Sequence, residues 1–110
     1  MNISAISSND YQLMTDACKL NREFDSIYAG DLLSVVMRSA SQGCTLITVI
    51  SNLNTIAVAV LLDIPAIIIT EDQVVSQAMI DKANTESVAI FKTAFKTHEV
   101  IIDFKDRGLI

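Results

Sequence analysis

The 110 residues carry 13 acidic and 8 basic side chains, giving a net charge of −5, and 51% of them are apolar while only 5% are aromatic. We expect neither nucleic acid nor an anionic membrane surface as a partner, because clustered basic side chains make the first contacts with both and this chain has no such cluster. The longest apolar run, 56–62, is far shorter than the roughly 20 residues that cross a bilayer.

The length fits one domain over residues 1–110. Charged residues make up only 19% of the chain, below the usual quarter, which favours an apolar face that meets a second copy in a homodimer. Cys18 and Cys44 lack a CxxC spacing and are expected to be reduced thiols. The first ten residues have neither the basic nor the apolar region of a secretory signal, so we expect a cytoplasmic protein.

The first predicted element is ambiguous. Leu13, Ala17 and Leu20 have helical spacing, whereas 11–15 alternates like a strand. The next segment is clearer: Asp31 is a good N-cap residue for a helix over 32–40, and Gly43 is expected to end that helix.

Residues 45–50 are short, β-branched and continuously apolar, which predicts a buried strand. The apolar segment that follows fits a strand or a helix by periodicity alone. Parallel strands need a crossover of a dozen or more residues, and 51–65 supplies one. We therefore predict a helix over 54–62 and a strand over 66–69.

Thr70 to Gln73 fits a capping box, which predicts a helix after it that Asn84 closes. A short strand is expected over 87–91. Thr93 should then cap a last helix that ends at Gly108. This order of elements predicts an α/β fold with a mostly parallel sheet flanked by helices.

Polar side chains follow the predicted strand 45–50, where open α/β sheets bind ligands. Ser51, Asn52 and Asn54 combine hydrogen-bonding groups with a helix N-terminus, and with Thr70 after the next strand they form our candidate ligand site. The same turn residues are also what any helix start requires, so capping alone remains an alternative. Glu71 and Asp72 would repel a phosphate more strongly than the helix dipole attracts one.

No catalytic, metal or cofactor site is expected. The chain has no P-loop motif, and its three glycines are isolated, so none forms a phosphate-cradling loop. His98 has no obvious converging partner and is interpreted as a surface residue. Glu99, Asp103 and Asp106 share a helical face, but interspersed lysines indicate a solvated surface rather than a cation site.

Four segments resemble the DRTGG-domain family in its small stand-alone form: YAGDLLSVVM, TLITVISNLNTIAVAV, PAIIITED and TAFKTHEVIIDFKDRGLI. The resemblance implies an α/β domain that dimerises and in which 11–15 is a strand. Related modules occur beside CBS domains in pyrophosphatases, ahead of phosphotransacetylases and at the N-terminus of HPr kinase. The kinase half of that enzyme is missing from this sequence.

The sequence departs from the family pattern at two turns. Where the namesake pattern has Asp-Arg after the central strand, this chain has 51–54, and where it has Thr-Gly-Gly, this chain has Thr70, Glu71 and Asp72. The resemblance implies a non-enzymatic, homodimeric regulatory module that senses a small ligand, with an adenine nucleotide as one candidate. The alternative is a protein-interaction subunit without a small-molecule ligand.

Overall fold

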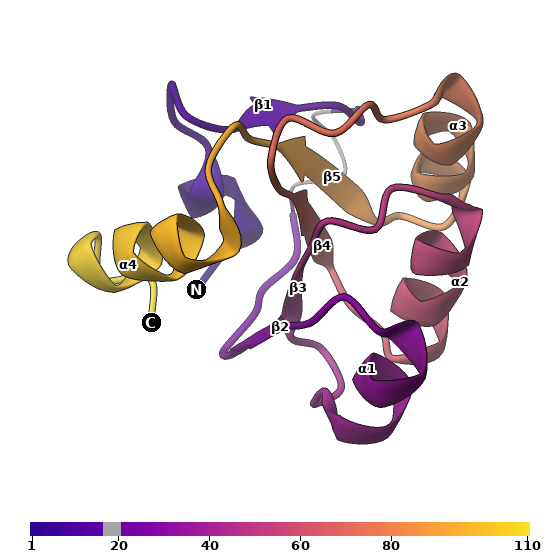
Figure 1. Ribbon diagram of the computed structural model, residues 1–110, viewed down its shortest axis with the longest axis horizontal. Helices are drawn as coiled ribbons and strands as arrows, with labels where there is room; N and C mark the ends of the chain where they lie inside the picture. Colours follow the sequence, from indigo (N-terminus) through magenta and orange to yellow (C-terminus); the bar gives the residue numbers. More distant parts are fainter. Residues whose placement is uncertain (17–20) are drawn as a thin grey trace.

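The computed structural model describes residues 1–16 and 21–110, and these residues build a five-stranded sheet (Figure 1). The strands follow one another across the sheet in the order β1-β5-β4-β3-β2. β2 to β5 are mutually parallel, and β1 pairs antiparallel with β5. Their bounds are β1 Gln12–Leu13, β2 Ile27–Ala29, β3 Thr45–Thr48, β4 Ala66–Ile69 and β5 Ala89–Lys92.

Helices cover both faces of the sheet. Their bounds are α1 Leu33–Ser39, α2 Leu53–Leu61, α3 Gln77–Thr85 and α4 Thr97–Asp106, with a 3-10 helix, η1, at Ile3–Ile6. Figure 1 shows α1, α2 and α3 on one side and α4 with the N-terminal segment on the other. Across the described residues no helix has the length and apolarity needed to traverse a bilayer. The mostly parallel α/β fold predicted from the sequence is confirmed.

Alternating side chains of the strands feed two apolar cores. Leu46, Ile67 and Ile90 pack with the three-helix layer, while Ile68 and Phe91 pack with α4 and η1. Both faces of the central strands are therefore buried, which explains why β4 is a continuous apolar run and why all four residues of β3, its two threonines included, are buried.

The chain changes sides of the sheet at β5. The crossovers that join β2 to β3, β3 to β4 and β4 to β5 run through α1, α2 and α3, and right-handed crossovers in one direction place their helices on one face. After β5 the chain instead crosses to the opposite face and forms α4 (Figure 1). The loops that leave β4 and β5 therefore diverge, which makes these two strand ends a topological switch point.

The strand predictions agree with the structure to within a few residues. β1 pairs with β5, which confirms a strand rather than a helix within 11–15. The crossover argument is also confirmed, because 54–62 lies almost wholly within α2 and β4 spans 66–69. Gly43 and Gly108 both have positive φ, at 79° and 74°; Gly108 follows α4 closely, whereas α1 already ends at Ser39, ahead of Gly43.

The predicted cap of the first long helix is wrong. The Asp31 carboxylate instead accepts hydrogen bonds from the Thr48 hydroxyl (3.0 Å) and the Val49 amide (2.8 Å). α1 starts after Leu32, with no side-chain cap. Asp31 thus links the ends of β2 and β3, a contact between distant residues that a local capping rule does not include.

The capping box at Thr70 is also wrong. Glu71 and Asp72 have φ of 59° and 55°, and the Gln73 amide donates to the Thr70 carbonyl at 3.4 Å. Two consecutive positive φ angles with this bond describe a tight type I′ turn rather than a helix start. Ser76 caps α3 instead, by accepting from the Met79 amide.

The predicted start of the last helix at Thr93 and the predicted end of α3 at Asn84 are also wrong. The Thr93 hydroxyl accepts from the nearby Phe95 amide at 3.1 Å, inside the loop before α4, and α4 begins only at Thr97. Asn84 lies within α3, and Ser87 takes the left-handed conformation after the helix, with φ of 58°. Cys44 is buried in the core, and Cys18 lies outside the described residues.

Candidate functional site

The turn between β3 and α2 is held by its own polar side chains. The Asn52 carboxamide oxygen accepts from the Asn54 amide at 2.9 Å and caps α2. The Ser51 hydroxyl donates to the Val74 carbonyl and lies 3.5 Å from the Met79 sulfur. Both side chains therefore already fix the turn and its distance from α3.

Three of the four predicted site residues line one shallow hollow of about 470 Å³. Its walls are Ser51, Asn52, Leu53, Asn54, Ser76 and Ala78. Thr70 does not line it: the residue is fully buried, and its hydroxyl has no hydrogen-bond partner among the described residues. The structure brings Ser51, Asn52 and Asn54 together and leaves Thr70 apart.

The residues that line this hollow carry no charge, and its polar residues can form hydrogen bonds with a ligand. Asn54 is exposed, and its side chain makes no polar contact within the described residues, so its amide is available to a ligand. The backbone amides of Asn54 and Thr55 are occupied by the side chain and the carbonyl of Asn52. A phosphate at the N-terminus of α2 would have to displace this cap.

The turn after β4 has no free backbone amides to offer. The Glu71 and Asp72 amides donate to the carbonyls of Phe95 and Thr93, both at 2.9 Å. These bonds join the two loops that leave β4 and β5. A phosphate there would meet two carboxylates and none of the turn amides that normally cradle an anion.

The acidic face of α4 lines a separate shallow hollow, together with Phe95, His98 and Ile102. Its carboxylates are Glu99, Asp103 and Asp106. Within residues 1–16 and 21–110, His, Cys, Asp and Glu side chains do not gather in threes that would hold a metal ion.

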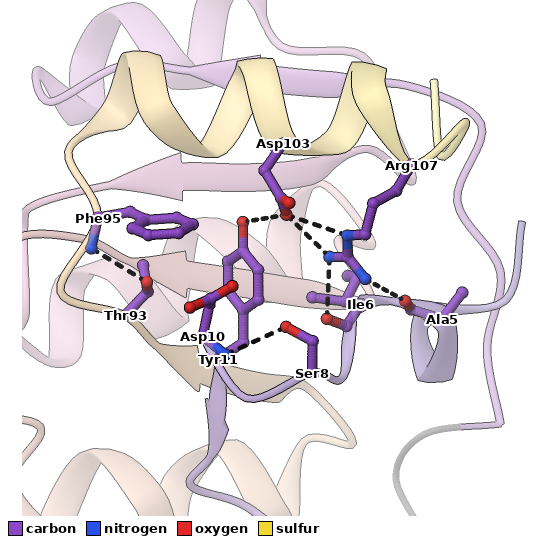
Figure 2. A network of polar contacts seen from close by, with 9 residues as sticks. All are labelled: Ala5, Ile6, Ser8, Asp10, Tyr11, Thr93, Phe95, Asp103 and Arg107. Atoms are coloured by element: carbon purple, nitrogen blue, oxygen red, sulfur yellow. Dashed lines mark hydrogen bonds and ion pairs between the residues drawn. The ribbon is translucent and has the colours of Figure 1, made fainter.

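A network that the sequence analysis missed ties the N-terminal segment to α4 (Figure 2). The Tyr11 hydroxyl donates to Asp103 Oδ2 at 2.8 Å, and Arg107 Nε donates to the same oxygen at 3.1 Å. Arg107 also donates to the carbonyls of Ala5 and Ile6. Of these contacts, only the ion pair between Asp103 and Arg107 could be predicted from the sequence, because the two residues are four positions apart.

Among residues 1–16 and 21–110, two titratable groups, Tyr11 and Cys44, are driven toward their neutral forms. Burial, followed by the hydrogen bond and negative charge of Asp103, raises the pKa of Tyr11. Burial likewise raises the pKa of the Cys44 thiol. Neither group is thus prepared to act as a base or a nucleophile at neutral pH.

The fold is that of a DRTGG-type α/β domain. It is similar to the crystal structure of the CBS and DRTGG domains of the regulatory region of Clostridium perfringens pyrophosphatase, complexed with its activator diadenosine tetraphosphate, with a TM-score of 0.69. The identity is 12%, and the match covers 84% of this chain and 40% of that chain. This chain therefore matches less than half of the length of that protein.

A family model described as HPr serine kinase N terminus matches residues 46–106, more than half of the chain. The protein belongs to this family. No curated protein matches the sequence. The resemblance stated from the four sequence segments is confirmed at the level of family and fold.

Proposed function

We propose that this chain is a non-enzymatic regulatory module of the cytoplasm that works as a homodimer. The observation that carries the proposal is the outer face of α2. This helix, LNTIAVAVL, contains no charged residue. It leaves Leu53 (50%), Val60 (42%) and Leu61 (69%) exposed to solvent.

The neighbouring helix extends this apolar surface. Leu32 and Met37, at α1, are 64% and 39% exposed, and α1 packs beside α2 (Figure 1). Exposed apolar side chains on two neighbouring helices support an interaction surface here, because large exposed apolar patches mark such surfaces in soluble proteins.

A second copy of the chain is the partner that fits this face best. Two molecules with a net charge of −5 repel one another, so a surface without charged side chains favours a contact between copies. α2 is such a surface, and the family resemblance implies dimerisation. A twofold contact would place the same apolar residues of both copies against each other.

Exchange of Leu61 for lysine tests this interface. Leu61→Lys would bring two ammonium groups together in a twofold contact, and we expect the dimer to weaken by about tenfold or more, or about 1.4 kcal/mol. Ile102→Lys is the matched control, since Ile102 is also an exposed apolar residue (56%) but lies on α4. Light scattering after size-exclusion chromatography would report both masses.

The two variants have distinct expected outcomes. The Ile102 variant should keep the mass of the parent protein, while the Leu61 variant should move toward the 12.0 kDa monomer. Equal masses for both variants would contradict the α2 interface.

The absence of enzymatic activity is supported by the chemistry of the described residues. The buried titratable groups are held neutral, and the proteins that this chain resembles are described as a regulatory region and a kinase N terminus. We expect no transfer of phosphate to serine when the protein is supplied with ATP and magnesium. Stoichiometric transfer of labelled phosphate to a substrate protein would refute this expectation.

Ligand sensing at Ser51, Asn52, Asn54 and Thr70 is the second part of the proposal. The hollow at 51–54 and the available Asn54 side chain support it, and the related pyrophosphatase region binds an adenine-containing activator. Thr70 would contribute only from beneath the surface. Calorimetry with adenine nucleotides tests this part: replacing Asn54 by alanine should weaken binding by about 1–3 kcal/mol, and an unchanged affinity would exclude the turn as the site.

A further inference from the structure

A hollow separate from the one at 51–54 lies at the carboxyl end of β5, beside the start of β1. It measures about 280 Å³ and is lined by Asp10, Gln12, Asp72, Lys92, Thr93 and Phe95, among others. At the hollow the loops after β4 and β5 are joined, because the Asp72 amide donates to the Thr93 carbonyl, and beyond it they lead to helices on opposite faces of the sheet (Figure 1). Open α/β sheets bind ligands at this kind of switch point.

The walls of the hollow carry charges of both signs. Lys92 Nζ lies 3.5 Å from Asp72 Oδ1, a loose pair in which the Asp72 side chain is 74% exposed and Lys92 only 23%. The Asp10 carboxylate has no polar partner within the described residues. A surface pair of this length, with one largely exposed partner, contributes little to stability, so a ligand can compete for both side chains.

An aromatic wall limits the hollow on one side. The Phe95 amide donates to the Thr93 hydroxyl, and the Phe95 ring meets the Tyr11 ring edge-on at 5.9 Å between centroids. Figure 2 shows Asp10, Thr93 and Phe95 on the same side of this network. The ring is therefore held in place by the buried Tyr11 before any ligand arrives.

We propose that this hollow binds a small zwitterion of the α-amino acid type, with its ammonium group at Asp10 and Asp72 and its carboxylate at Lys92. A free anion is disfavoured, because the residues that line the hollow include two carboxylates and one ammonium group. A hard cation is disfavoured as well, because calcium takes six to eight oxygen ligands and the described residues provide no group of three acidic or histidine side chains. A molecule with both charges satisfies all three side chains.

The size of the hollow agrees with this class of ligand. Pockets for drug-sized molecules span about 300–1,000 Å³, so a hollow of about 280 Å³ suits a small metabolite. The site shares no residue with the α2 face, so its test is independent of dimer formation.

Nuclear magnetic resonance of the full chain tests the proposal, with glycine, L-alanine, L-leucine and L-arginine as probes. At least one probe should shift the amide resonances of Asp72, Lys92 and Phe95 in a saturable way below ~10 mM, the range of weak specific binding. Ethylamine and propionate, which each keep one of the two charges of alanine, should bind at least about tenfold more weakly.

Charge-removing variants provide the control. Asp10→Asn and Lys92→Gln should each weaken the bound amino acid by about tenfold, whereas Asp106→Asn and Lys105→Gln, which make the same charge changes on α4, should not. The proposal is overturned by any of three results: no saturable shift with the four probes, equal binding of ethylamine or propionate, or equal effects of the site and control variants. Displacement of the amino acid by calcium at equal concentration would identify a cation site instead and would also overturn it.

Discussion

Glu71 and Asp72 carry side chains through a backbone conformation that normally favours glycine. The left-handed region brings Cβ close to the following carbonyl oxygen, and aspartate tolerates this better than glutamate does. The namesake family pattern has two glycines here. In this chain the turn is built from strained residues, and its amides join the β4 and β5 loops.

Replacing Glu71 by glycine should therefore stabilise the protein. We expect the free energy of unfolding to rise by about 0.5–1 kcal/mol, because the relief of left-handed strain exceeds the extra backbone entropy of glycine. Glu71→Ala is the matched control, since it removes the carboxylate and keeps Cβ. Urea denaturation should find the alanine variant no more stable than the parent. Equal stabilisation by both changes would attribute the effect to charge.

The Tyr11 hydroxyl should make stability depend on alkaline pH. Its folded pKa is raised above the ordinary value of 10.0, because burial and Asp103 disfavour the phenolate. The folded state therefore holds this proton more tightly than the unfolded state does. The stabilising contribution is present below pH 10.0 and decreases as the pH rises above it.

Tyr11→Phe removes both the hydrogen bond and this pH dependence. We expect a loss of about 1.5–3 kcal/mol at neutral pH, the range for a hydrogen bond to a charged group. Thermal unfolding of both proteins between pH 8 and pH 11 would measure the difference. A parent protein whose decline above pH 10.0 is no steeper than that of the variant would show that Tyr11 is not the titrating group.

At the scale of elements, sequence patterns located the strands well and the helix starts poorly. Buried parallel strands are short apolar runs whatever surrounds them, so β3 and β4 were predictable. Asp31, Thr70 and Thr93 each have the chemistry of an N-cap, but the sheet placed them at strand ends. There Asp31 bonds to the distant Thr48, Thr93 bonds to the Phe95 amide in the adjoining loop, and Thr70 remains buried. Local rules could not include these tertiary contacts.

Asn52, the N-cap of α2, is a capping residue that both the sequence and the structure support, and its contribution can be tested directly. Asn52→Ala should cost about 1 kcal/mol of stability, because the Asn54 amide would lose its partner. Asn54→Ala should change stability little, since that side chain is exposed and makes no polar contact within the described residues. Urea midpoints of the two variants should differ accordingly, and equal midpoints would argue against the cap.

The whole molecule combines features that the sequence could indicate with others that it could not. The turn at 51–54 was found because it follows a strand, yet the burial of Thr70 depends on the depth of its position in the assembled sheet. Tyr11 and Asp103 are 92 residues apart, so no local pattern joins them. The switch point between β4 and β5 depends on the packing of α4 against the opposite face of the sheet (Figure 1), which no local pattern in the sequence specifies.

Sedimentation equilibrium of the unmodified chain tests the central claim, that this is a homodimeric regulatory module, most directly. We expect a single species of twice the 12.0 kDa chain mass at micromolar concentration, because the uncharged face of α2 is exposed in the monomer. A monomer that persists at ~100 µM, well above the micromolar affinity of a specific interface, would contradict the account.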